Sequence, residues 1–379
     1  MNINLLDCTL RDGGYYNNWD FDIDMVNEYL EVMQDVGVNY VELGLRQFSN
    51  NKYTGPFAYT TEIFLDRLSL PEGPVYGVMI DAKSILSLDG DQSENINKLF
   101  NFRDYEKIGL VRVAAHFDEV PYCRPMLEQL KLKGFKVGLN IMQASLRESI
   151  ELEEKSSLVN GWDCVDVLYF ADSLGSMTDT DVARVYTAIR KYWIGDIGFH
   201  AHNNMGQGVS NVKSAIDMGC TWIDGTVSGM GRGAGNAETE YLLEDSRLGK
   251  NKDLSSIFSL VVNFFDPLKK CHGWGTSIPY YLGAKLGLHP TYVQELCAMK
   301  DLDKTNLHQI LEDLGKVKKP QSFSPSILSD VIAKRTNISK VDGSKVDSSL
   351  QNREIVLVAQ TQSSVKYKEA ILDYAETKD

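Results

Sequence analysis

The sequence predicts a (β/α)₈ barrel with a C-terminal helical extension. Eight short apolar runs alternate with helical patterns over roughly 230 residues, which is the number and length that such a barrel requires. Most runs are almost continuously apolar, as expected of parallel strands covered on both faces. Nearly every run ends in a polar or ionisable residue, where barrel enzymes carry their active sites. An open doubly wound sheet is the alternative, but no G-x-G-x-x-G sequence opens the first helix.

The first strand and helix set the pattern for the others. Residues 4–9 form an apolar strand that leads to Arg11-Asp12, and the following Gly13-Gly14 indicates a turn. A helix is expected from 22 to 35, because its apolar residues recur at helical spacing and Gly37 follows it. The further strands are expected at residues 40–44, 74–81, 109–116, 136–142, 165–172, 197–202 and 222–228. The helices between them are expected near residues 92–104, 119–134, 147–158, 179–192 and 206–219.

Polar residues at the strand ends supply the candidates for a site. They are Arg11, Asp12, Glu42, Asp81, His116, Gln143, Asp172, Ser173, His200, His202, Thr226 and Ser228. Helix capping explains some of them, because Asp, Ser and Asn are good N-cap residues. Glu42 and Asp81 could each orient a metal ligand or pair with Arg11 or Arg46, and we favour a structural role for Asp81.

Two histidines at the end of the seventh strand, His200 and His202, indicate a metal site. Residues two apart on a strand face the same side, so both imidazoles would enter one cavity. Ordinary core or surface histidines explain an isolated pair equally well, but Asp12 converges on the same barrel mouth. With Asn236 as a fourth ligand, this O and N set suits a divalent ion, Mn²⁺ or Mg²⁺ before Fe²⁺, Co²⁺ or Zn²⁺. Such an ion would polarise a 2-oxo group, and Arg11 would add a fixed cation.

A glycine-rich loop, residues 229–236, follows the eighth strand, and a helix is expected from 237 to 248. Two interpretations of the loop stay open. A glycine-rich loop at this place in a barrel often cradles phosphate. Glycines also permit close backbone approach, which would bring the Asn236 side chain over the barrel mouth.

The strand–helix rhythm stops near residue 250, so the chain divides into three parts. Residues 1–285 form the barrel, 286–340 a helical extension, and 341–379 a linker with a strand and a helix that could begin a further module. Helices are expected near residues 252–268, 278–287, 291–300, 304–315 and 324–334. His272, His289 and His308 have no ligand spacing here and are taken as ordinary residues.

The composition excludes several functions. A net charge of -13 without basic runs argues against nucleic acid and anionic membranes as partners. No apolar run reaches the ~20 residues of a membrane span, and the N-terminus lacks the pattern of a signal peptide. Six scattered cysteines without a C-x-x-C pair indicate buried thiols in a reducing compartment. A cytoplasmic location is therefore expected.

Three short motifs carry a family resemblance. Thr9-Leu10-Arg11-Asp12-Gly13, His200-Ala201-His202-Asn203 and Gly233-Ala234-Gly235-Asn236-Ala237 resemble the motifs of the DRE-TIM metallolyase superfamily, in the same order. That superfamily contains 4-hydroxy-2-oxovalerate aldolase, hydroxymethylglutaryl-CoA lyase, isopropylmalate synthase and homocitrate synthase. The resemblance implies that Asp12, His200, His202 and Asn236 hold a divalent metal and that Arg11 stabilises an enolate. It also nominates Ser173 and His116 for substrate binding, since Ala171-Asp172-Ser173 and residues 112–116 are similar to aldolase segments.

The motifs also depart from each family branch. Gly14-Tyr15 stands where the synthases have Glu-Gln, and residues 229–236 lack the cysteine of the hydroxymethylglutaryl lyases. Tyr15 occupies the place of the aldolases' histidine base, and a tyrosine with a pKa near 10 is a poor base at neutral pH. Residues 273–281 resemble the aldolase region that bears a second tyrosine, which nominates Tyr280. Arg11, Tyr15 and Tyr280 are thus the catalytic candidates.

Three functions remain under consideration. The first is a metal-dependent aldolase or lyase that acts on a small-molecule 2-oxo acid and an aldehyde through a pyruvate-type enolate. The second is a Claisen-type synthase similar to isopropylmalate or homocitrate synthase. The third is a catalytically inert barrel that binds a ligand. A homo-oligomer is compatible with each of them.

Overall fold

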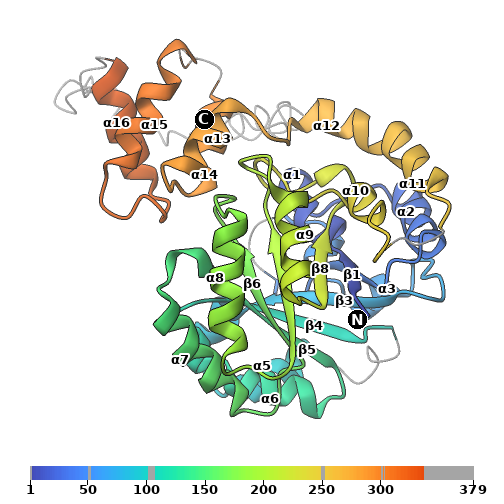
Figure 1. Cartoon of the computed structure of the whole chain (residues 1–379). Coiled ribbons are helices and arrows are strands. Elements are labelled where there is room, and N and C mark those ends of the chain that lie inside the picture. Colours follow the sequence, from blue (N-terminus) through green and yellow to red (C-terminus); the bar gives the residue numbers. More distant parts are fainter. Residues whose placement is uncertain are drawn as a thin grey trace, which may run out of the picture. The chain divides into compact units, whose positions relative to one another are not determined.

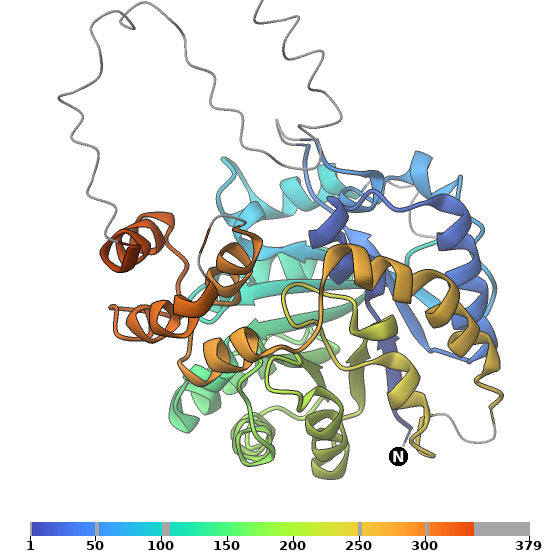
Figure 2. The ribbon, with the colours of Figure 1, turned by 90° about the horizontal axis from the view of Figure 1, so that it is seen from above.

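The computed structural model contains a closed barrel of eight parallel strands in consecutive order, β1 to β8, with β8 paired back to β1. It describes residues 2–49, 53–100, 107–248, 252–299, 302 and 304–336. Helices lie outside the ring of strands, as Figures 1 and 2 show. The (β/α)₈ prediction is confirmed, and the open doubly wound alternative is wrong because the sheet closes.

The strands match the expected ranges closely. They are β1 (Asn4–Asp7), β2 (Tyr40–Leu45), β3 (Val75–Asp81), β4 (Leu110–His116), β5 (Lys136–Met142), β6 (Val167–Asp172), β7 (Asp196–Ala201) and β8 (Trp222–Gly225). The first and last strands are shorter than expected, because the backbone turns into helical conformation soon after each of them.

The helices follow in chain order. Those of the barrel are α1 (Thr9–Asn17), α2 (Ile23–Asp35), α3 (Glu62–Leu65), α4 (Ala82–Leu86), α5 (Gln92–Leu99), α6 (Arg124–Leu132), α7 (Ser149–Asn160), α8 (Asp179–Arg190), α9 (Gly208–Met218) and α10 (Thr239–Leu243). Those beyond it are α11 (Ser255–Leu260), α12 (Asp266–His272), α13 (Ile278–Lys285), α14 (Pro290–Ala298), α15 (Leu307–Gly315) and α16 (Pro325–Thr336), with a π-helical turn, η5 (Val261–Phe265), joining α11 to α12. Short 3₁₀ turns are η1 (Pro56–Ala58), η2 (Val120–Tyr122), η3 (Ala144–Leu146), η4 (Val227–Gly229) and η6 (Lys304–Asn306).

The segment expected as a turn after the first strand is a helix instead. Residues 9–17 form α1, and the Asp12 amide donates to the Cys8 carbonyl. The two glycines are needed for packing: a Cβ on Gly13 would lie 2.7 Å from the Met230 sulfur, and one on Gly14 would overlap the Trp19 ring. Asp12 therefore sits on a helix that directly follows β1, rather than on the strand itself.

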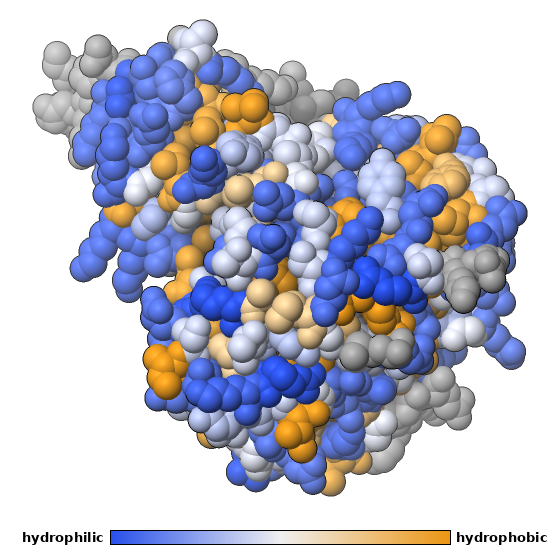
Figure 3. All heavy atoms as spheres, viewed as in Figure 1, coloured by the Kyte–Doolittle hydropathy of each residue, from blue (hydrophilic) through white to orange (hydrophobic). Residues whose placement is uncertain are grey.

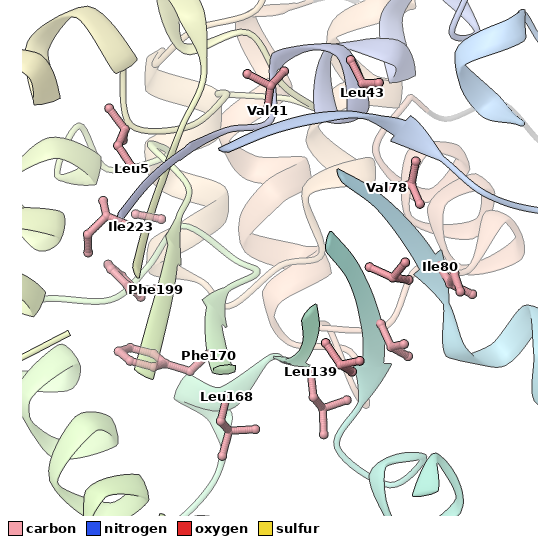
Figure 4. Close-up of a cluster of buried hydrophobic side chains, with 14 of the residues drawn as sticks. Leu5, Val41, Leu43, Val78, Ile80, Leu139, Leu168, Phe170, Phe199 and Ile223 are labelled. Atoms are coloured by element: carbon pink, nitrogen blue, oxygen red, sulfur yellow. The ribbon is translucent and has the colours of Figure 1, made fainter. Parts of the chain in front are cut away.

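The core lies between the strands and the surrounding helices. Figure 4 shows apolar side chains from successive strands, such as Val41, Ile80, Phe170 and Phe199, within this buried layer. The Phe170 and Phe199 rings are 4.7 Å apart. A second, smaller cluster fills one end of the barrel interior and comprises Leu6, Cys8, Leu110, Val167, Tyr169 and Trp222. The apolar strand residues therefore point both outward toward the helices and inward into the barrel, as expected of parallel strands that are covered on both faces.

The chain as far as Val331 forms one compact unit, which includes α11 to α15. The division into a barrel domain and a helical extension stays a prediction. The linker and the module expected at 341–379 lie outside the described residues.

No helix in the described ranges is long and apolar enough to cross a bilayer. On the face in Figure 3, polar residues surround scattered apolar patches. Four of the six free cysteines are buried, but Cys271 is exposed and Cys297 is half-buried, contrary to expectation.

We expect Gly198→Ala on β7 to destabilise the barrel, because the added Cβ would overlap the Tyr169 ring inside it. Overpacking of this kind costs about 1–3 kcal/mol. Urea unfolding would measure the change, with Gly161→Ala as the matched control. Gly161 has a φ of -75°, and its new Cβ would lie 3.5 Å from the nearest atom, so this variant should match the wild type. Equal stability of both variants would contradict the packing argument.

Candidate active site

A cavity of about 400 Å³ opens at the C-terminal ends of the strands. Residues from the strand ends, from α1, from the glycine-rich loop and from the extension meet in it. Its lining includes Arg11, Asp12, Tyr15, Asp81, His116, Asn140, Ser173, His200, His202, Arg232 and His289. Residues that are far apart in the sequence therefore form one site.

The start of α1 fixes the first two residues of the site. The Thr9 amide donates to the Asp7 carboxylate, and the Thr9 hydroxyl accepts from the Val227 amide, which ties the helix to β1 and to the segment after β8. Arg11 and Asp12 then follow in the first turn, where an acidic residue is favoured by the helix dipole. Their guanidinium and carboxylate groups are 2.8 Å apart and buried.

A ring of buried charges crosses the barrel interior beneath the cavity. Arg11 donates to Glu42 at 2.7 Å, and Arg112 donates to both oxygens of Glu42 at 2.7 Å. Arg112 also donates to Asp224 at 2.6 Å, and His200 Nδ1 donates to the same carboxylate at 2.9 Å. His200 Nε2 lies 3.5 Å from the Asp12 carboxylate, which bonds back to Arg11.

Tyr169 and Gly138 accommodate the Arg112 side chain of this ring. The Arg112 guanidinium carbon lies 4.8 Å from the Tyr169 ring centroid, and a Cβ on Gly138 would lie 3.0 Å from the Arg112 chain. Glu42 pairs with Arg11 and Arg112, whereas Arg46 pairs with Glu62 at 3.1 Å. Of the two partners expected for Glu42, Arg11 is therefore correct and Arg46 is not.

The protonation states follow from this ring. Burial alone would raise the pKa of Asp12, but Arg11 and His200 hold it well below its usual range. Burial would also raise the pKa of Asp224, yet Arg112 and His200 lower it. Burial and the neighbouring His200 lower the pKa of His202 to about 4. Asp12 and Asp224 are thus carboxylates and His202 is a neutral imidazole at neutral pH.

The donor set at the cavity fits a divalent ion. Asp12, His200 and His202 each offer one ligand atom, and the three atoms lie within 4.8 Å of one another. His202 Nδ1 donates to the Asp172 carbonyl at 2.7 Å, which leaves Nε2 free as a ligand. Asn236 donates to Asp12 at 2.6 Å, and its buried Oδ1 has no hydrogen-bond partner among the described residues. An unpartnered amide oxygen beside two imidazoles and a carboxylate is an arrangement that a divalent cation would satisfy.

A second group of potential ligands, Cys8, His200 and Asp224, lies close by. It is a poorer set, because burial raises the pKa of the Cys8 thiol to about 11 and metals bind the thiolate. The Asp224 oxygen that faces His200 also accepts from Arg112. Asp224 therefore orients His200, as carboxylates commonly do for metal-binding histidines.

The glycine-rich loop provides close backbone approach. A Cβ on Gly231 would overlap the Asn236 amide, and one on Gly235 would overlap the Gly229 carbonyl. The amides of Gly229, Met230, Gly235 and Asn236 already donate to backbone carbonyls, so they cannot also donate to a phosphate. His202 and Asn236 form an isolated bridge, which places the two side by side. These contacts favour the second interpretation of the loop.

The remaining expected residues fall into two groups. Tyr15, His116 and Ser173 line the cavity, and the Ser173 hydroxyl accepts from the Gln143 amide at 2.9 Å. Tyr280 is not among the lining residues; its ring lies against Gly233, where a Cβ would be 3.0 Å away. Asp81 caps α4 through the Lys83 amide, in keeping with its structural role, and also lines the cavity.

Among the lining residues that the sequence did not indicate, three bear on the chemistry of the site. His289, taken as an ordinary residue, is the N-cap of α14 and lines the cavity, so the extension contributes to the site. Asn140 on β5 has a buried side-chain oxygen without a partner in the described part of the chain. Arg232 lies in the glycine-rich loop and lines the cavity. Its place in the sequence, just before the motif that contains Asn236, could have indicated that it belongs to the site.

Together these features define a (β/α)₈ barrel enzyme with an oxygen and nitrogen donor set for a divalent ion at its mouth. A sequence model described as HMGL-like matches residues 122–260. The 4-hydroxy-2-oxovalerate aldolase of Chloroflexus aggregans is 31% identical over 261 residues, which are 68% of this chain and 73% of the aldolase. The oxaloacetate decarboxylase of Mycobacterium tuberculosis is 28% identical over 242 residues, 63% of this chain and 68% of the decarboxylase.

Among solved structures, the N-terminal domain of a putative aldolase from Bacteroides vulgatus superimposes with a TM-score of 0.71 and 31% identity. The superposition covers 79% of this chain and 97% of the Bacteroides vulgatus chain. The chain belongs to the HMGL-like family, and the resemblance to the DRE-TIM metallolyases is confirmed. It is a metal-dependent lyase of that family, which rules out the inert barrel.

We expect Glu42→Gln to destabilise the fold strongly, because it removes the carboxylate that Arg11 and Arg112 share in the barrel interior. Breaking a buried charge pair costs about 3–5 kcal/mol. The free energy of urea unfolding would measure the loss. Glu128→Gln on α6 is the control, since its pair with Arg124 is exposed and should contribute at most about 0.5 kcal/mol. A loss of similar size in both variants would show that the ring does not stabilise the barrel.

Proposed function

We propose that the chain is an aldolase of 4-hydroxy-2-oxo acids, which cleaves the C3–C4 bond to release pyruvate and an aldehyde. The observation that carries the proposal is the cluster of Asp12, His200 and His202 beside the Arg11 guanidinium at the barrel mouth. A carboxylate, two imidazoles and a fixed cation suit the formation of an enolate from a 2-oxo acid. The relatives named 4-hydroxy-2-oxovalerate aldolase support the same chemistry.

Asp12, His200, His202 and Asn236 would hold the divalent ion, with Mn²⁺ or Mg²⁺ favoured over Co²⁺ or Zn²⁺ by the oxygen ligands. When bound there, the ion acts as a Lewis acid toward the 2-oxo group. Asp224 orients His200, and the Asp172 carbonyl orients His202, so both rings present Nε2 to the same point.

Arg11 and Ser173 would bind the acid itself. Arg11 is held by Glu42 and Asp12 through Nε and Nη1, so its charge is fixed beside the position where the enolate oxygen develops. The Ser173 hydroxyl accepts from the Gln143 amide, which leaves its own proton free to donate to the substrate carboxylate. His116 lines the same cavity and can add a further hydrogen bond.

Cleavage also needs a group that takes the proton of the 4-hydroxyl. As that proton leaves, the C–O bond becomes the aldehyde carbonyl and the C3–C4 electron pair passes into the pyruvate enolate, which a second proton then quenches at C3. Tyr15 and Tyr280 were the candidates, and we assign the transfer to His289 instead. Burial, Arg232 and His116 lower its pKa to about 4, so the ring is neutral at pH 7. Its Nδ1 accepts from the Thr291 amide at 3.3 Å, so the ring must give up this long bond and carry its proton on Nδ1 before Nε2 can accept the hydroxyl proton.

Decarboxylation of a 2-oxo dicarboxylic acid is a second candidate, favoured by the relative named oxaloacetate decarboxylase. Loss of CO₂ from C4 would leave the same pyruvate enolate, so the same residues could stabilise it. The two reactions differ in their need for a base, because decarboxylation has no hydroxyl proton to remove.

The aldolase proposal is tested by metal content and pyruvate release together. We expect stoichiometric metal by elemental analysis, and pyruvate from Mn²⁺-loaded protein and a panel of 4-hydroxy-2-oxo acids, coupled to lactate dehydrogenase. His200→Ala should lose both, because it removes a ligand, whereas His308→Ala, on the exposed face of α15, should lose neither. Metal without pyruvate from any acid would favour the Claisen-type synthase, and absence of metal would refute both.

The role of His289 is tested by His289→Asn, since asparagine keeps a good N-cap for α14 while removing the imidazole. We expect kcat for hydroxy-acid cleavage to fall by about 10²–10⁴, as for loss of a general acid–base group. Decarboxylation of oxaloacetate should fall much less. His272→Asn is the control, because that imidazole is partly buried beside Tyr16 and does not line the cavity. An unchanged kcat in His289→Asn would reassign the proton transfer.

A further inference from the structure

Arg232 is a positive charge at the cavity without a counter-charge among the residues that the structure describes. It lines the cavity from the glycine-rich loop, and its guanidinium carbon lies 5.3 Å from the centroid of the Tyr15 ring. Within the described residues it has no carboxylate partner and no side-chain hydrogen bond. Arg11 and Arg112, by contrast, are each paired with two carboxylates. An arginine held at a binding cavity without a partner is free to bind an anion from solution.

The loop backbone holds Arg232 in this place. Its carbonyl accepts from the Gly235 amide at 3.2 Å. The next residue, Gly233, accepts from the Tyr16 hydroxyl at 3.0 Å and from the Gly275 amide at 3.3 Å. These bonds join the loop to α1 and to the segment before α13, so little ordering is required when an anion binds.

The groups around Arg232 are mostly imidazoles. Its field reaches His289 and His202, where it adds to the effect of burial in lowering the pKa of each ring to about 4. His116 also lines this part of the site. The lining contains one carboxylate besides Asp12, that of Asp81, which is engaged at the N-terminus of α4. The imidazoles here are neutral and the Asp81 carboxylate already has a hydrogen-bond donor, so Arg232 is the cation that an incoming carboxylate would meet in this part of the lining.

Arg232 stands at the outer end of the cavity. Tyr15, over which it lies, is 44% exposed, whereas Asp12 and His200 are buried. An acid bound at Asp12, His200 and His202 would therefore extend its far end toward Arg232. The volume of about 400 Å³ exceeds what pyruvate alone would fill.

We propose that Arg232 binds a carboxylate at the end of the substrate distal to the 2-oxo group, so that the preferred substrates are 4-hydroxy-2-oxo dicarboxylic acids. This inference rests on the proposed aldolase function and specifies its substrate class. The guanidinium fork matches a carboxylate in a bidentate manner, and such charge-assisted bonds are the stronger ones in proteins. The aldehyde released would then be an oxo acid rather than an uncharged aldehyde.

The test uses two unreactive ligands that differ only at the far end, 2-oxoglutarate and 2-oxopentanoate. Calorimetric titration of Mn²⁺-loaded protein should show 2-oxoglutarate binding roughly tenfold to hundredfold more tightly. Arg232→Gln should bring the ratio of the two dissociation constants close to one, and Arg232→Lys should keep part of it. The matched control is Arg67→Gln, an exposed arginine that does not line the cavity, which should keep the wild-type ratio.

The same comparison can be made in turnover. The kcat/KM ratio of 4-hydroxy-2-oxoglutarate to 4-hydroxy-2-oxopentanoate should exceed ten in the wild type and fall with Arg232→Gln. Thermal unfolding would confirm that the variant is folded. Selective binding of 2-oxoglutarate without pyruvate release from either hydroxy acid would refute the aldolase while supporting the carboxylate subsite.

Several results would overturn the inference. One is equal affinity of the wild type for both ligands, and failure to bind either would count in the same way. Another is a preference for 2-oxopentanoate. The third is an equal loss of affinity for both ligands in Arg232→Gln, since that would place the arginine at the 2-oxo carboxylate that the ligands share.

Discussion

The pairing of Arg112 with Glu42 and Asp224 is the interaction on which the site depends. All three side chains are buried in the barrel interior, where an unpaired charge would be very costly. They come from β4, β2 and β8, so the pairing forms only when the barrel closes. Glu42 then holds Arg11, and Asp224 holds His200. The metal donors and the cation beside them are therefore positioned by the same contacts that fill the barrel, and the fold and the site cannot be altered independently.

The charge of this ring also suits its substrate. Asp12, Glu42 and Asp224 carry three negative charges against the two positive charges of Arg11 and Arg112. Against the effect of burial, Asp12 and Asp224 raise the pKa of His200 well above its usual range, so a proton on His200 makes the ring neutral when no cation is bound. A divalent cation held by the donor set would make the net charge positive. An anionic 2-oxo acid is then attracted to the mouth of the barrel.

The sequence predicts the barrel well, because buried parallel strands leave apolar runs and their polar ends mark the mouth. His200, His202 and Asp12 could be found for the same reason. The helix α1 (Thr9–Asn17) could not, because Gly13 and Gly14 favour a turn locally, and only the packing of Met230 and Trp19 explains them. Arg112 could not be paired with its carboxylates either, since β2 and β8 are not its neighbours in the sheet.

His289 and Arg232 show why substrate identity is harder to predict than chemistry. The groups that would form the enolate lie on α1 and β7, whose positions the barrel fixes. His289 and Arg232 lie on the extension and on a loop, which strand periodicity does not place. Loops and appended helices can change without disturbing the core, so they are where barrels of one family come to differ in substrate. An enolate site on the barrel, with an outer end built from a loop and an appended helix, would allow related chains to differ in substrate, as the relatives named as aldolases and as a decarboxylase do.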